Sequence, residues 1–96
     1  MHVISRKPLL EFWNRHTDSK EPLLRWYRIL QATAFENWDQ LHAVFPSADK
    51  VDQWIVFNIG GNKYRLVTHV NYDFQIIYIK FIGSHAEYDR IDPETI

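Results

Sequence analysis

The chain has 96 residues, the size of a single domain, and its 46% hydrophobic and 16% aromatic residues indicate a folded globule rather than a disordered tail. The absence of cysteine excludes disulfides and thiolate zinc sites, and no apolar run approaches the roughly 20 residues that a membrane span requires. Many nucleic-acid-binding domains carry a large positive charge, whereas the net charge of this chain is −1. Nucleic-acid binding would therefore need a local cluster of basic residues.

The N-terminal half is predicted to form a short strand and three helices. Residues 2–5 have strand character, and Ser5 is a candidate N-cap for a helix over residues 6–17. Charges run through this opening segment, so we expect no signal peptide, a cytoplasmic location and no membrane association. A second helix is expected from Pro22, because apolar residues follow at helical spacing: Leu23, Trp26, Tyr27 and Leu30. A third helix is predicted over residues 37–45, and polar residues 47–53 are expected to form a connection.

From Trp54 the apolar period changes to two, which predicts strands over residues 54–59, 63–71 and 74–82. The glycines of the GGN segment supply the positive φ that a tight hairpin turn demands, and the polar NYD segment supplies a second reversal. Helices followed by an antiparallel meander predict one α+β domain over residues 1–96, with the helices packed on one face of the sheet.

Strand alternation predicts which side chains share a face. Two-residue turns place one set toward the helices: Ile55, Phe57, Ile59, Tyr64, Leu66, Thr68, Val70, Ile77, Ile79 and Phe81. The opposite face then carries Trp54, Val56, Asn58, Lys63, Arg65, Val67, His69, Ile76, Tyr78 and Lys80. In this register Arg65 lies directly opposite Lys80, and such a like-charge pair is destabilising unless an anion binds between the two.

The segment GSHAEYDR predicts a short C-terminal helix, because Ser84 and Glu87 have the spacing of a capping box. His85, Tyr88 and Asp89 then lie on one side of this helix. The helix starts where the strand of Lys80 ends, so we expect its polar side to overhang the basic face.

These side chains suit RNA cleavage without a metal. Cations stabilise the charge of a phosphodiester transition state, histidine transfers protons near neutral pH, and tyrosine stacks on a base or protonates a leaving oxygen. The predicted catalytic residues are Arg65, Lys80, His85 and Tyr88, and the predicted RNA-binding residues are Lys63, Asn58, His69 and Tyr78. No histidine pair or carboxylate cluster has the spacing of metal ligands, so neither a metal nor a cofactor is expected.

Each candidate has a structural alternative. Lys63 can be an ordinary solvated lysine after a turn, and His69 can be a structural residue at the margin of the site. His85 can be a residue of the first helical turn without further duty, and Tyr88 can anchor the helix to the sheet. Asp89 can be structural, orient His85 or pair with a cation.

With these residues identified, the chain resembles the HigB family of type II toxins, within the RelE superfamily of ribosome-dependent mRNA interferases. The resemblance covers MHVIS, LHAVFPSAD, WIVFNIGGNKYRLV and SHAEYD, and it is most specific in FNIGGNKYRLV and HAEYD. It implies a RelE-like α+β fold with helices on an antiparallel sheet. By position, Arg65 matches the strand arginine of the family, Lys80 a basic residue of the final strand, and His85 with Tyr88 its H-x-E-Y-D segment.

The resemblance also implies a function: cleavage of mRNA on translating ribosomes, contact with ribosomal RNA, and neutralisation by a cognate HigA-like antitoxin. Two other hypotheses stay open. One is a catalytically inactive family member that binds its antitoxin or RNA, and the other is a general RNA-binding module.

Overall fold

The structure is a computed structural model that describes residues 1–92. Its elements in chain order are β1 (His2–Ile4), α1 (Lys7–Arg15), the 3-10 helix η1 (Thr17–Ser19), α2 (Lys20–Ala32), α3 (Trp38–Val44), β2 (Asp49–Val51), β3 (Trp54–Ile59), β4 (Tyr64–Asn71), β5 (Ile76–Ser84) and α4 (His85–Asp89). Among these residues no helix has the length and apolar character needed to cross a membrane.

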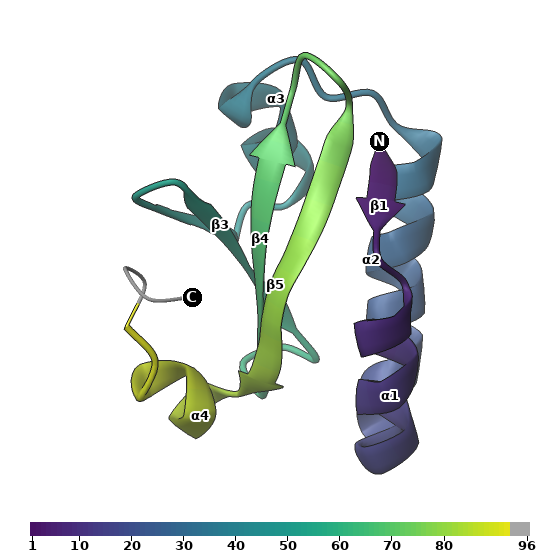
Figure 1. Cartoon of the computed structure of the whole chain (residues 1–96), viewed down its shortest axis with the longest axis vertical. Helices are drawn as coiled ribbons and strands as arrows, with labels where there is room; N and C mark the ends of the chain where they lie inside the picture. Colours follow the sequence, from purple (N-terminus) through teal and green to yellow (C-terminus); the bar gives the residue numbers. More distant parts are fainter. Residues whose placement is uncertain (93–96) are drawn as a thin grey trace.

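One five-stranded sheet, in the order β1-β5-β4-β3-β2, organises the fold. β1 pairs with β5 in parallel, and the other neighbours are antiparallel. Helices α1 and α2 run along one side of the sheet, whereas α4 lies on the other side at the end of β5 (Figure 1). The predicted α+β class, with N-terminal helices on one face and a short C-terminal helix, is confirmed.

The helices differ from prediction mainly at their starts. α2 begins at Lys20 rather than Pro22, because η1 runs directly into it, and Pro22 occupies its first turn. The Ser5 N-cap prediction is wrong: Arg6 is the N-cap of α1, although the Ser5 hydroxyl accepts a hydrogen bond from the Lys7 N–H at 3.3 Å. The connection expected over residues 47–53 contains strand β2, which pairs with β3 at the edge of the sheet.

The main core fills the space between the helices and one face of the sheet. Its buried helical residues follow the predicted stripes and include Leu9, Phe12, Trp13, Leu23, Trp26, Leu30 and Leu41. The buried strand residues facing them are Ile55, Phe57, Ile59, Tyr64, Leu66 and Ile77. Phe81 was expected here but lies on the opposite face, where it packs with Trp54, Val56 and Val67.

The first hairpin turn confirms the role of the glycines. Gly60 and Gly61 have φ of 64° and 68°, a region that side-chain-bearing residues rarely adopt. Ile59 pairs with Tyr64, so residues 60–63 form the loop and even positions of β3 face odd positions of β4, as predicted.

The second hairpin differs from prediction and moves β5 along β4. Asn71 pairs with Ile76, which leaves residues 72–75 in the loop instead of a two-residue turn. Gln75 has φ of 56°, and its side-chain amide accepts from the Phe35 N–H at 3.2 Å and donates to the Phe35 and Tyr72 carbonyls at 2.7 Å each. This loop is therefore fixed by the segment between α2 and α3, which local sequence cannot indicate.

Candidate functional site

The face opposite α1 and α2 carries three successive rows of side chains. Cross-strand pairing aligns Asn58, Arg65 and Gly83 in one row, and Val56, Val67 and Phe81 in the next. The third row contains Trp54, His69 and Tyr78. The centroid of the His69 ring lies 6.0 Å from that of Trp54 and 6.3 Å from that of Tyr78. Arg65 and His69 are four positions apart, so strand geometry separates the outer rows by about 13 Å.

The predicted opposition of Arg65 and Lys80 is wrong. Arg65 pairs with Gly83, because the longer second loop shifts β5 and a β-bulge between Val67 and Thr68 adds one further residue on β5. That extra residue is Lys80. Both cations remain on the face opposite the helices, but they lie at different ends of it, with the apolar Val67 row between them.

Lys80 belongs with the aromatic group. Its ammonium lies 6.0 Å from the centroid of the Trp54 ring, a geometry suited to cation–π attraction. A shallow hollow of about 360 Å³ is lined by Gln53, Trp54, His69, Tyr78 and Lys80. His69, Tyr78 and Lys80 were predicted from the sequence as RNA contacts or catalytic groups, whereas Gln53 and Trp54 were not.

Arg65 is held at the other end by its own hairpin. Its guanidinium donates to the Asn62 side-chain oxygen at 2.8 Å and to the Asn62 and Tyr64 carbonyls at 3.3 Å each. The side chain is only partly buried, so the remaining donors can reach a ligand. Neighbouring Asn58 donates to the Ser47 carbonyl at 3.3 Å, which ties the row to the segment before β2.

The histidine of α4 is positioned by the helix. Both hydrogen bonds of the predicted capping box are present, with the Ser84 hydroxyl accepting from the Glu87 N–H and the Glu87 carboxylate accepting from the Ser84 N–H. His85 Nδ1 lies 3.1 Å from a carboxylate oxygen of Asp89, and the His85 N–H donates to the Lys63 carbonyl at 3.1 Å. The imidazole is therefore oriented by a carboxylate and sits beside the hairpin that carries Arg65.

Tyr88 packs against the sheet. It joins the small apolar cluster of Trp54, Val56 and Val67, together with Phe81 and Ile91. This contact matches the anchoring alternative, and it also holds α4 over the apolar row next to Arg65. Arg65, His85 and Tyr88 thus lie in one region around the start of α4, whereas Lys80, His69 and Tyr78 lie in another.

Lys63 faces the helices instead of the outer face. Its ammonium forms an ion pair with Asp18 of η1, which also accepts a hydrogen bond from the Tyr64 hydroxyl at 2.6 Å. The hydrogen bond from Lys63, followed by that from Tyr64, lowers the pKa of Asp18 below its usual value, and the same carboxylate raises the pKa of both partners. The assignment of Lys63 to the basic face is therefore wrong.

This ion pair predicts a pH dependence of stability. Because the pKa of Asp18 is lower in the folded state than its usual value of 3.8, its contribution is present above that pH and is lost as the pH falls through the lowered value. We expect Asp18→Asn to lower the free energy of unfolding at pH 7, and the difference from wild type to shrink between about pH 5 and about pH 2. Urea titrations of both proteins across this range measure it. A difference that stays constant with pH would contradict the assignment.

Gly83 belongs to this region although the sequence did not predict it as a site residue. A Cβ at this position would lie 2.6 Å from Cζ of the Phe81 ring and 3.3 Å from Cβ of Glu87. The ring thus covers the strand beside Arg65, and only glycine leaves room for it. A lone glycine in a strand indicates a close approach of this kind, which was the available signal.

Gly83→Ala is therefore expected to lower the free energy of unfolding by about 1–3 kcal/mol, the usual cost of overpacking. Chemical denaturation measures the loss. In a Phe81→Leu background the cost of the alanine should be smaller, because the clashing ring atom is gone. Equal costs in the two backgrounds would show that the ring is not the cause.

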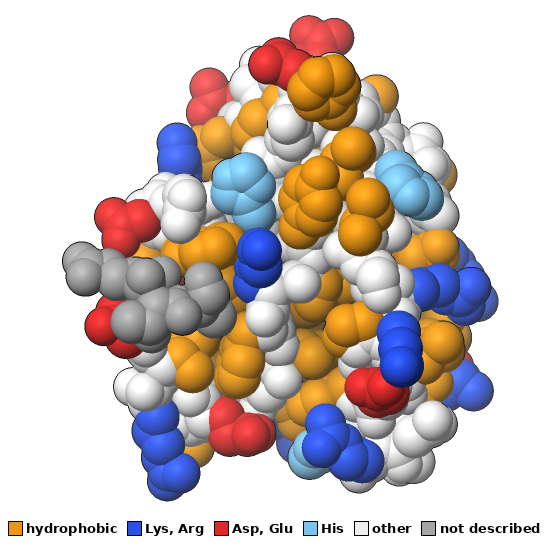
Figure 2. Space-filling model, in the orientation of Figure 1, with side chains coloured by type: hydrophobic (Ala, Val, Ile, Leu, Met, Phe, Trp, Pro, Cys, Tyr) orange, Lys and Arg blue, Asp and Glu red, His pale blue; other side chains and the backbone are white. Residues whose placement is uncertain are grey.

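The charge on this face is dispersed. Figure 2 shows hydrophobic and uncharged side chains over much of its middle, with most lysine and arginine side chains toward the edges and acidic side chains among them. Among residues 1–92 no group of three or more histidine, cysteine, aspartate or glutamate side chains could hold a metal ion. The chemistry available at the two regions is that of single cations, imidazoles and phenols.

Comparison with known proteins identifies the family of this chain. The profile of the HigB toxin family, described as the RelE-like toxic component of a toxin–antitoxin system, matches residues 19–91. The chain belongs to the HigB toxin family. The match runs from α2 through strands β2 to β5 to α4, and family membership implies an antitoxin partner.

Relatives of this HigB-family chain share most of its length. It is 30% identical over 94 residues to the mRNA interferase HigB of Escherichia coli O6:H1, covering 95% of this chain and 91% of the relative. It is 35% identical over 92 residues to the mRNA interferase toxin HigB of Escherichia coli strain K12 and to the mRNA interferase HigB of Shigella flexneri, covering 93% of this chain and 88% of each relative.

Proposed function

We propose that this chain is an endoribonuclease that cleaves mRNA on translating ribosomes by attack of the ribose 2′-hydroxyl, without a metal ion. The names of its relatives support mRNA as the substrate. The observation that carries the chemistry is the position of the His85 imidazole, whose Nδ1 lies 3.1 Å from a carboxylate oxygen of Asp89. His85 is the first residue of α4, two positions after Gly83, which pairs with Arg65.

The reaction uses the region around the start of α4. His85 accepts the proton of the 2′-hydroxyl, whose oxygen forms a bond to the adjacent phosphorus. The bond from phosphorus to the 5′-oxygen breaks, and the Tyr88 hydroxyl protonates that oxygen. Arg65 stabilises the added negative charge on the phosphoryl oxygens. The products are a 2′,3′-cyclic phosphate and a 5′-hydroxyl.

The second region binds a neighbouring part of the same strand. Lys80 attracts a phosphate, and the rings of His69 and Tyr78 offer a stacking surface for a base. Lys80 is directed to the hollow beside Trp54, and the apolar Val67 row lies between it and Arg65, so its role is substrate binding. Asn58 contributes its amide beside Arg65.

Induced expression followed by mapping of mRNA 5′ ends tests the proposal. We expect new cleavage sites within translated regions for the wild-type chain, and none for a variant with both Arg65→Ala and His85→Ala. In a purified reaction, cleavage should require translating ribosomes, and free mRNA should remain intact. Cleavage of free mRNA at equal rate would overturn the ribosome dependence.

An inactive, binding-only family member is the second candidate function. Two observations favour it: the net charge of −1, and the pairing of Lys63 with Asp18, which removes one cation from the RNA-facing surface. This candidate predicts intact transcripts and unaffected growth on induction, with antitoxin binding retained.

A further inference from the structure

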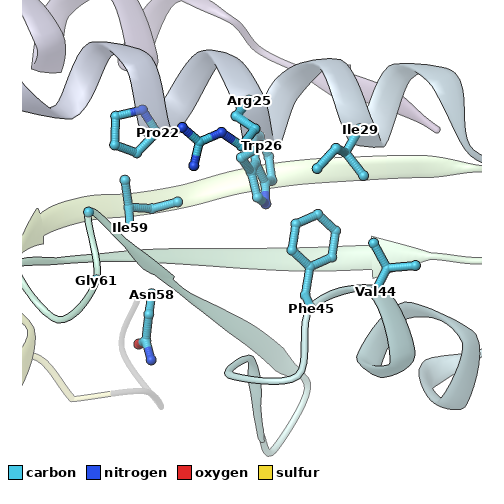
Figure 3. A pocket seen from close by; sticks show the side chains of 10 residues that line it. Pro22, Arg25, Trp26, Ile29, Val44, Phe45, Asn58, Ile59 and Gly61 are labelled. Carbon is cyan, nitrogen blue, oxygen red and sulfur yellow. The ribbon is translucent and has the colours of Figure 1, made fainter.

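A groove separate from the proposed catalytic region lies where α2 faces the end of α3 and the turn after β3. It encloses about 290 Å³. Figure 3 shows Pro22, Arg25, Trp26 and Ile29 extending from α2 toward this space, with Phe45 and Val44 at one end and Ile59 across from them. Nothing in the proposed cleavage reaction uses α2 or α3.

The groove contains an unpaired buried donor. Trp26 is 2% exposed, and its indole nitrogen is fully buried and has no hydrogen-bond partner among residues 1–92. The nitrogen lies on the side of the ring that points away from α2 into the groove (Figure 3). The Trp26 ring makes an edge-to-face contact with the Phe57 ring, with 5.4 Å between the two centroids. Buried donors without an acceptor are rare in proteins, so this N–H is an unsatisfied polar group directly beneath the surface of the groove.

The rest of the groove combines one cation with apolar walls. Arg25 is exposed, and within residues 1–92 it makes no ion pair. Ile29 is partly exposed and Val44 is 47% exposed. Phe45, at the same end of the groove as Val44, packs on Phe57 with 5.1 Å between the ring centroids. The complementary ligand is an apolar side chain next to a carboxylate.

We infer that this groove is the docking site for a segment of the antitoxin that presents an aliphatic side chain beside an acidic residue. The carboxylate pairs with Arg25, and the aliphatic side chain packs between Ile29 and Val44. The inference rests on the antitoxin partner that family membership implies. RNA fits the groove less well, because backbone binding depends on several cations and this groove offers one.

The groove also reaches the strand that carries the proposed site. Asn58 lines it and pairs across β3 and β4 with Arg65. A segment bound along α2 therefore ends beside the Arg65 row, which gives docking a direct route to control of cleavage.

Titration of purified chain with its purified cognate antitoxin, by calorimetry, tests the inference. We expect Arg25→Glu to weaken binding by about 30-fold or more, the effect of losing one interface hot spot. Arg28→Glu is the matched control, with the same change of charge on an exposed position of α2 outside the groove, and should bind as wild type does. Val44→Asp, at the apolar wall, should weaken binding as well.

Cleavage in the ribosome reaction, assayed without antitoxin, separates the possible outcomes. We expect Arg25→Glu to cleave at the wild-type rate and to escape inhibition by added antitoxin. Unchanged antitoxin affinity in both Arg25→Glu and Val44→Asp would overturn the docking site, and lost cleavage in Arg25→Glu would assign the groove to RNA. A wild-type chain that binds antitoxin through Arg25 but never cleaves would refute the proposed function alone.

Discussion

Arg65→Ala is expected to reduce mRNA cleavage by about 10²–10³-fold, equivalent to about 2.7–4 kcal/mol of transition-state stabilisation. Three hydrogen bonds to the hairpin hold the guanidinium in place before substrate arrives, so it needs little reorganisation when charge develops on the phosphate. Single-turnover cleavage on translating ribosomes measures the loss.

Two controls separate chemistry from folding. The side chain of Arg65 is partly exposed and its three hydrogen bonds go to Asn62 and Tyr64 of the same hairpin, so the thermal midpoint of Arg65→Ala should remain within a few degrees of wild type. Arg28→Ala, which removes an exposed arginine from α2, should retain full cleavage. Full activity in Arg65→Ala would remove this residue from the mechanism.

His85→Ala is expected to slow cleavage by about 10²–10⁴-fold, the usual contribution of a positioned acid or base. The side chain of His85 is 47% exposed, so its loss should leave the stability of the fold nearly unchanged. Asp89→Asn should give a smaller loss, confined to kcat with KM unchanged, because Asp89 positions the imidazole and does not contact the substrate. Ala86→Ser, a small change at the neighbouring position of α4, is the control and should retain wild-type kcat. Equal losses in kcat for His85→Ala and Ala86→Ser would show a general disturbance of α4.

Local sequence rules predicted most of the elements correctly. Apolar periodicity located α1, α2, α3 and the three long strands, and the spacing of Ser84 and Glu87 predicted the capped start of α4. The alternation of β3 and β4 also placed Arg65 opposite the helices, since Gly60 and Gly61 fixed the first turn. These features depend on neighbours in the chain.

The errors have a different origin, because they depend on contacts between distant residues. Gln75 sets the second loop through Phe35, 40 positions away, and the bulge at Lys80 then moves Arg65 opposite Gly83. Lys63 is drawn to Asp18, 45 positions away. Alternation alone could not show these contacts, and it therefore joined two regions that the fold keeps apart.

The outer face of the sheet therefore carries two regions, one around Arg65 and one around Lys80. The proposed single cluster of cations becomes a cleavage region with Arg65, His85 and Tyr88, and a binding region with Lys80, His69 and Tyr78. The apolar row of Val56, Val67 and Phe81 lies between them and supports α4 through Tyr88. We therefore expect substitutions in the second region to raise KM more than they lower kcat.

The chemical nature of the new RNA ends tests the central proposal most directly. Attack by the 2′-hydroxyl, assisted by His85 and Arg65, leaves a 2′,3′-cyclic phosphate on one fragment and a 5′-hydroxyl on the other. Mass spectrometry of fragments from the ribosome reaction should show these ends. A 3′-hydroxyl paired with a 5′-phosphate would contradict the mechanism.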